Sequence, residues 1–214
     1  MRLQLCFIAI GFVACTQADL SQQLNTSLCS DDFNRSDAFS YGSNWELNGL
    51  SSVQLSYGIT SQAAYASLTA PGWGFLSCAT KIQQSRTIIS AKIKLSNALT
   101  GTAGTGIVAR SQAKDTISDA YYCGLEAGKL ILYKGVNVLR TNLASSAGTY
   151  NANTEYTLTF SLIDNQLTCS VSGAATDSVS ATDSSFSSGY TGMFMLVASN
   201  LRIDFDDFKT EAKP

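Results

Sequence analysis

Histidine is missing altogether from this chain of 214 residues. Its absence excludes the Ser-His-Asp and Cys-His catalytic mechanisms, together with most zinc and transition-metal sites. Any catalysis would have to use carboxylates, Tyr, Lys, Arg or hydroxyl groups. Charge is also scarce, because only 14% of the residues are charged and the formal net charge is −2. Since nucleic-acid binding needs a basic patch for the phosphates, the sequence argues against a nucleic-acid partner.

Helical periodicity is absent as well, and no Cys-x-x-Cys pair suggests a redox or metal motif. The clearest pattern is the alternation in Arg86–Leu95, where apolar side chains point one way and two lysines the other. A short strand and a turn-rich crossing are expected over 30–45, a turn at 71–74 and a loop at 144–153. Further strands are expected at 53–57, 64–68, 75–79, 104–112, 137–142, 177–181, 193–198 and 201–208. This pattern predicts an all-β fold, a two-sheet antiparallel β-sandwich of the jelly-roll type.

The N-terminus is typical of a secretory signal peptide. An apolar run at Leu5–Ala14 is followed by Thr16–Ala18, which ends in a small residue as a signal peptidase site does. We expect a signal peptide at 1–18, a flexible segment at 19–28 and one β-sandwich domain at 29–211. Lipid anchoring at Cys15 is the minor alternative. No second apolar run is long enough to span a bilayer, so we expect a secreted protein.

Two hairpins can be predicted residue by residue. The first joins Tyr121–Glu126 to Lys129–Lys134 through a two-residue loop, which fixes the register of the pair. Tyr122 then lies opposite Tyr133 on one side of the sheet, and Cys123 lies on the other side among aliphatic residues. In the second hairpin, over 156–171, Cys169 likewise lies on the apolar side. Each hairpin should therefore bury one face in the core.

Four cysteines remain beyond the predicted leader: Cys29, Cys78, Cys123 and Cys169. An even number in a secreted chain favours two disulfides, although four cysteines permit three connectivities. If the two hairpins belong to opposite sheets, their apolar faces meet in the core. Cys123 would then bridge to Cys169, which leaves Cys29 with Cys78. The alternative is buried free thiols, which behave as small hydrophobic groups.

Seven segments of the chain carry a family pattern: DDFNR at 31–35, GSNW at 42–45, GIVARS at 106–111, DAYYCGLEAGKLILYK at 119–134, YTLTFSLIDNQLTCSVSG at 156–173, SATDSSFSSGYTGMF at 180–194 and IDFDDF at 203–208. Together, and in this order, they resemble the concanavalin A-like, laminin-G-like (LamG) jelly-roll β-sandwich modules of secreted proteins. The resemblance implies a fold with the first and last strands side by side and Trp45 in its framework. It implies no particular activity, because fold does not carry function.

The polar face of the first hairpin is the candidate ligand-binding surface. Tyr122 and Tyr133 form a cross-strand aromatic pair, and we expect Arg110 and Glu126 to join them. Rings beside charged hydrogen-bonding groups suit a sugar, whose CH faces stack on rings while its hydroxyls take hydrogen bonds. Trp73, in the expected turn, is either a sugar-stacking residue or a plug at the rim of the sandwich. The alternative for the tyrosines is ordinary sheet packing, since Tyr is favoured in strands.

Two pairs of acids lie near the two ends of the predicted domain: Asp31, Asp32, Asp206 and Asp207. If the first and last strands run side by side, their carboxylate oxygens could hold a structural Ca²⁺. The alternative is that these acids cap strand ends, pair with Arg35 or Arg202, or face water.

The sequence thus predicts a secreted, non-enzymatic β-sandwich that binds a glycan or another extracellular surface, with no cofactor beyond the possible Ca²⁺. A glycoside-acting hydrolase of the same fold is one alternative. Its two-carboxylate chemistry needs acids facing each other, and the nearest group, Asp204 with Asp206 and Asp207, contains no Glu. A purely structural or adhesive secreted protein is the other alternative.

Overall fold

The computed structural model describes residues 3–9, 12–18, 27–49, 55–68, 70–114, 119–137, 139–197 and 201–214. All the elements in these ranges are β-strands, which confirms the all-β prediction. Across the same ranges, there is no helix with the length and apolar character needed to cross a membrane.

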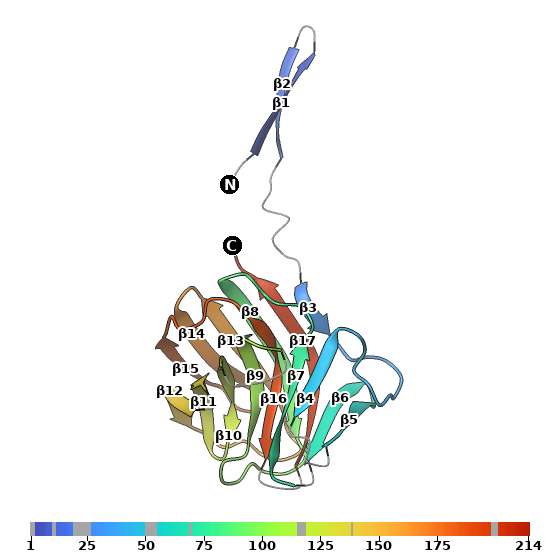
Figure 1. The fold of residues 1–214 in the computed structure, drawn as a ribbon, viewed down its shortest axis with the longest axis vertical. Coiled ribbons are helices and arrows are strands. Elements are labelled where there is room, and N and C mark those ends of the chain that lie inside the picture. The colour runs from blue at the N-terminus through green and yellow to red at the C-terminus, as the bar shows by residue number, and fades with distance from the viewer. Residues whose placement is uncertain are drawn as a thin grey trace.

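One layer of the sandwich is a seven-stranded antiparallel sheet (Figure 1). From one edge to the other its strands are β12 (Leu139–Ala147), β11 (Lys129–Val136), β10 (Ala120–Glu126), β9 (Gly104–Ser111), β16 (Tyr190–Val197), β7 (Gly72–Cys78) and β4 (Trp45–Gly49). We call it the seven-stranded sheet.

The other layer is an eight-stranded antiparallel sheet, which we call the eight-stranded sheet. Its order is β15 (Asp177–Thr182), β14 (Gln166–Gly173), β13 (Glu155–Ile163), β8 (Arg86–Leu95), β17 (Leu201–Ala212), β6 (Ala63–Leu68) and β5 (Leu55–Thr60), and β3 (Ser27–Asp31) also pairs with β17. The first and last strands of the sandwich therefore lie side by side, as the resemblance implied.

The remaining two strands, β1 (Leu3–Ala9) and β2 (Phe12–Ala18), pair with each other in a small sheet apart from the sandwich (Figure 1). The signal peptide at 1–18 stays a prediction. Residues 19–26 of the expected flexible segment lie outside the described residues. Strand β3 begins at Ser27, which pairs with Glu211 in β17.

Both hairpin registers are confirmed. Tyr122 lies opposite Tyr133 in the pairing of β10 with β11, and Phe160 lies opposite Cys169 in that of β13 with β14. The two hairpins belong to opposite sheets. Their apolar faces meet, and both predicted disulfides, Cys123–Cys169 and Cys29–Cys78, are present. Each disulfide joins a strand of one sheet to a strand of the other.

The core lies between the sheets and takes alternate residues from their strands, as the period of two in a strand requires. In β8, for example, Ile93 and Leu95 are fully buried, while the lysine between them is exposed. Trp45 is 7% exposed and packs edge-on against Phe208, with 5.1 Å between ring centroids. The prediction that Trp45 is a core residue is therefore confirmed.

Several strands differ in extent from the sequence prediction, and three of the differences are informative. β4 was missed, because the side chains from Glu46 to Asn48 are half-buried and give no alternating pattern. β7 begins at Gly72, so Trp73 lies in a strand and not in a turn. β12 continues to Ala147 through residues expected to form a loop, because pairing with β11 orders a segment whose small polar residues have little preference of their own.

Candidate binding sites

The outer face of the seven-stranded sheet, which points away from the other sheet, carries a second apolar cluster. Its buried members are Phe75, Val108, Ala120, Tyr122, Ile131 and Phe194. Trp73 and Tyr133 are half-buried and pack against this cluster. We call this surface the aromatic face. It carries three of the predicted ligand-binding residues, Trp73, Tyr122 and Tyr133, although Trp73 in β7 is far in the sequence from the hairpin of the two tyrosines.

Close approach of the backbones shapes the aromatic face. Gly106 of β9 lies opposite Gly124 of β10. A Cβ atom at Gly124 would stand 2.3 Å from the carbonyl oxygen of Thr105 and 3.1 Å from Cζ of Phe194. Only glycine fits here, and its missing side chain makes room for the Phe194 ring. That ring meets Tyr122 edge-on, with 5.4 Å between centroids.

Tyr122 is 6% exposed, whereas Tyr133 is half-buried. The sheet-packing alternative therefore describes Tyr122 well, since its ring is enclosed by the cluster. Burial also raises the pKa of Tyr122 well above its usual value. Of this tyrosine pair, Tyr133 is the one that a ligand from solution can reach.

A polar group lies at the edge of the aromatic face, near β12. Glu126 accepts two hydrogen bonds: one from the Tyr133 hydroxyl, at 2.7 Å, and one from the Arg140 guanidinium, at 2.5 Å. The Arg140 guanidinium also lies over the Tyr133 ring, 4.1 Å from its centroid. Burial, followed by the hydrogen bond to Glu126, raises the pKa of Tyr133 to about 12. We call these three residues the edge triad.

Sequence reasoning missed Arg140. It lies two strands from Glu126, and the pairing of β11 with β12 shifts register between Leu132 and Tyr133. Such an irregularity changes which side chains share a face, and a sequence pattern does not reveal it. The sequence offers only a weak signal for Arg140: it lies in the strand that follows the predicted hairpin of Tyr133 and Glu126.

Arg110 does not join the aromatic face, so that expectation was wrong. It is 5% exposed and has a left-handed backbone, with φ of 52°, which breaks the alternation of β9. Its guanidinium donates hydrogen bonds to the carbonyl oxygens of Phe186, Ser85 and Asp164, at 2.9, 2.5 and 3.0 Å. Burial lowers the pKa of this guanidinium. Arg110 thus ties three connecting segments together at one end of the sandwich.

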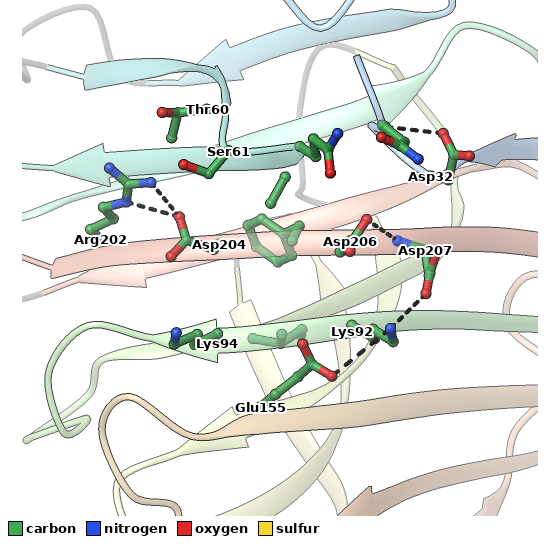
Figure 2. A pocket seen from close by; sticks show the side chains of 15 residues that line it. Asp32, Thr60, Ser61, Lys92, Lys94, Glu155, Arg202, Asp204, Asp206 and Asp207 are labelled. Atoms are coloured by element: carbon green, nitrogen blue, oxygen red, sulfur yellow. Dashed lines mark hydrogen bonds and ion pairs between the residues drawn. The ribbon is translucent and has the colours of Figure 1, made fainter. Parts of the chain in front are cut away.

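The outer face of the eight-stranded sheet is different, because it holds a hollow of about 630 Å³ (Figure 2). Strands β17 and β8 form its floor. The β5–β6 turn, the Asp32–Asn34 segment and Glu155 of β13 surround it. The charged residues that line it are Asp32, Lys92, Lys94, Glu155, Arg202, Asp204, Asp206 and Asp207. We call it the charged hollow.

Part of this charge is paired. The Arg202 guanidinium donates twice to Oδ1 of Asp204, at 2.8 and 2.6 Å, and lies 4.4 Å from the centroid of the Tyr65 ring. Lys92 lies 2.8 Å from Asp207 and 3.9 Å from Glu155. The acid considered for a hydrolase, Asp204, is therefore already held by an arginine.

A β-bulge in β17 explains why two adjacent acids line the same hollow. Neighbouring residues of a regular strand point to opposite faces. The pairing of β17 with β8 shifts register between Asp206 and Lys209, and Asp207 has a left-handed backbone with φ of 48°. The bulge turns Asp206 and Asp207 to the same side, and Phe208 still enters the core.

The four acids predicted to hold Ca²⁺ separate into two environments. Asp32, Asp206 and Asp207 line the charged hollow. Asp31 accepts hydrogen bonds from Arg35, from the Trp45 indole and from the Phe33 amide. Burial alone would raise the pKa of Asp31, but these hydrogen bonds, Arg35 first, outweigh it and lower the pKa.

Both oxygens of Asp31 are thus taken by protein donors, which does not fit a calcium ligand. In the ranges that the structure describes, no three His, Cys, Asp or Glu residues are placed to hold a metal ion. Calcium binding by the other acids stays a prediction.

Two antiparallel sheets pack face to face, and two disulfides join them across the core. This arrangement defines a concanavalin A-like jelly-roll β-sandwich. No protein-family model and no curated protein sequence matches this chain. Solved structures do match it in fold. The carbohydrate-binding module CBM66 from Bacillus subtilis is 17% identical, with a TM-score of 0.63, and the match covers 82% of this chain and 100% of the module.

Two further structures of the same architecture match at lower identity. A protein of unknown function with a galectin-like fold, also from Bacillus subtilis, is 9% identical with a TM-score of 0.65, over 88% of this chain and 98% of that one. The exoplasmic/lumenal domain of VIP36, solved with Ca²⁺ and Man3GlcNAc, is 12% identical with a TM-score of 0.57, over 81% and 86% of the two chains. At these identities the likeness shows the fold alone.

Proposed function

We propose that this protein is a secreted, non-enzymatic carbohydrate-binding module, and that it holds its glycan at the edge triad. The observation that carries the proposal is the Glu126–Tyr133–Arg140 group beside an apolar floor of aromatic side chains, with Arg140 exposed, Tyr133 half-buried and the Glu126 side chain 12% exposed. Two of these residues, Glu126 and Tyr133, belong to the binding surface predicted from the sequence. Tyr122 supports them from below, and Trp73 lies on the same face.

The chemistry of the triad suits an uncharged sugar. Each Glu126 oxygen already accepts one hydrogen bond and keeps a second lone pair, and the Arg140 guanidinium has N–H groups beyond the one that Glu126 uses. Two neighbouring hydroxyls of one sugar ring can therefore find an acceptor and a donor. The charges of the two groups cancel, which favours a neutral glycan. Because Arg140 covers one face of the Tyr133 ring, we expect the sugar to contact the ring edge and the hydroxyl.

Several broader observations support the proposal. Two disulfides are typical of proteins in extracellular or lumenal compartments. Solved structures of similar fold include a carbohydrate-binding module and a lumenal domain with a bound mannose-containing glycan. We also propose that the protein belongs to the laminin-G-like family, because the seven sequence segments described above resemble that family. Nucleic acid is not a proposed partner, given the weak net charge.

A glycan array followed by calorimetry on the best hit tests this proposal. Arg140→Ala and Glu126→Gln should each weaken binding at least tenfold, because each removes one half of the hydroxyl-recognising pair. The matched control is Arg202→Ala, which removes an arginine stacked on a tyrosine on the opposite sheet. It should leave this binding unchanged. No hit on the array, or no hit whose binding the triad variants weaken, would overturn the proposal.

A further inference from the structure

The charged hollow carries more acid than base. Five carboxylates and three cationic side chains line it. Figure 2 shows that these charges are unevenly spread, since Asp32, Asp206 and Asp207 lie towards one end and Arg202 and Lys94 towards the other. The hollow therefore has an end with an excess of acid, where Lys92 pairs with Asp207, and an end with an excess of base, where Arg202 pairs with Asp204. We call them the acidic end and the basic end.

Hydrogen bonds within the protein leave several carboxylate oxygens of the hollow without a donor. Arg202 uses only Oδ1 of Asp204, and the Asp207 amide uses only Oδ1 of Asp206. Asp32 accepts one hydrogen bond, from the Asn34 amide at Oδ1. Among the described residues, no donor bonds to the second oxygen of these three carboxylates. Asp204 and Asp206 are half-buried and Asp32 is exposed, and carboxylate oxygens that lack a donor in the protein favour a ligand rich in donors.

Asp206 is the least compensated of these acids. Its side chain is half-buried, and burial, together with the neighbouring Asp207 charge, raises its pKa although Lys92 acts in the opposite direction. A cation that bound beside it would favour its charged form. The acidic end of the hollow thus suits a positively charged group of a ligand.

The backbone around the hollow is also unusual. Four non-glycine residues with left-handed backbones lie at or directly beside its rim: Phe33, Ser61, Gln62 and Asp207. Ser61 and Gln62 form the two-residue turn between β5 and β6, and Asp37 holds this turn by accepting a hydrogen bond from the Ser61 amide at 2.9 Å. Positive φ at both central residues is the ordinary geometry of a two-residue hairpin turn, and that of Asp207 belongs to the bulge in β17, so the rim of the hollow has a defined backbone shape.

Aromatic stacking plays no part in the hollow. Phe205 and Ile93, the large apolar residues of its floor, have their side chains in the core. The Tyr65 ring lies beneath the Arg202 guanidinium. Recognition here rests on charge and hydrogen bonds, in contrast to the aromatic face.

We propose that the charged hollow is a second binding site, independent of the edge triad, and that it takes an amino sugar with a protonated amine. The amine lies at the acidic end, against Asp206 and Asp32. The ring hydroxyls donate to the free oxygen of Asp204 and accept from Lys94 and from the hydroxyl of Ser61. A volume of about 630 Å³ lies within the range of small-molecule sites.

Calorimetry with a glucosamine tetramer tests the proposal, and its fully N-acetylated counterpart is the matched ligand without charge. The glucosamine tetramer should bind at least tenfold more tightly than the acetylated one, and its binding should weaken as salt is raised. Asp206→Asn should weaken binding at least tenfold. Glu211→Gln removes an acid from the same strand but outside the hollow, so it should change nothing.

Three outcomes would overturn the proposal: equal affinity for the two tetramers, unchanged binding by Asp206→Asn, or binding of Ca²⁺ to the protein without any binding of the glucosamine tetramer. Thermal unfolding of each variant verifies that the fold is kept. Arg140→Ala should retain glucosamine binding, which separates this site from the edge triad. The two proposals can therefore fail independently.

Discussion

The outer faces of the two sheets have the same backbone architecture and opposite chemistry. On the seven-stranded sheet, aromatic rings pack on one another over a floor of glycines, and the edge triad stands at the edge near β12. On the eight-stranded sheet, lysines and acids alternate across β8, β17 and β13 and leave a hollow among them. A packed apolar face adds stability, whereas a charged and solvated face adds little and leaves groups open to a ligand.

The largest expected effect is on the aromatic face. Phe194→Ala should lower the free energy of unfolding by about 3–5 kcal/mol, because it removes a buried ring and leaves a cavity beside Tyr122. Urea unfolding measures this free energy. On the eight-stranded sheet, Asp204→Asn should lower the free energy of unfolding by less than about 1 kcal/mol, as is usual for the loss of a partly exposed ion pair. Similar losses for the two variants would remove the proposed contrast between the faces.

The second prediction concerns the glycine floor. Gly124→Ala should lower the free energy of unfolding by about 2–3 kcal/mol, because the new methyl group must push against the Thr105 carbonyl. The same urea titration on Ser161→Ala, in the outward face of β13, is the control and should show a change within about 0.5 kcal/mol. A Gly124→Ala protein as stable as the wild type would mean that the strands can separate at little cost.

A third, smaller effect concerns Asp183 and Asp206, whose pKa values shift in opposite directions. Burial would raise the pKa of Asp183, but hydrogen bonds from Lys134, Tyr121 and Ser185 outweigh it and hold the pKa well below its usual value. The stability that this lowered pKa provides is complete above the unfolded pKa of about 3.9, and it is lost as the pH falls towards the folded value.

Asp183→Asn should therefore lower the free energy of unfolding by about 1–2 kcal/mol at neutral pH and flatten its decline below about pH 4. The pKa of Asp206 in the charged hollow is raised, so Asp206→Asn should instead leave neutral stability equal or slightly higher. Unfolding midpoints measured from pH 7 to pH 2 check both. Equal declines in acid for wild type and Asp183→Asn would contradict the role given to Asp183.

The sequence predicted those parts of the fold in which local rules suffice. The register at Tyr122–Tyr133 follows from a two-residue turn, and the Cys123–Cys169 bridge follows from two hairpins whose apolar faces meet. Arg110 was misplaced because its side chain direction depends on one left-handed residue. The charged hollow was predicted only as scattered acids, since a bulge at Asp207 and pairing between distant strands create it. Such departures from regular geometry carry no sequence period.

The pairing of β3 with β17 has a mechanical consequence. Ser27, where the sandwich begins, lies opposite Glu211, one residue before β17 ends. A force that pulls the two ends of the sandwich apart would peel β3 away one hydrogen bond after another, which is the weak direction of an antiparallel pair. Peeling must stop at Cys29, because its disulfide fastens this strand to β7 in the opposite layer. Under tension the covalent bond, rather than the sheet, bears the load.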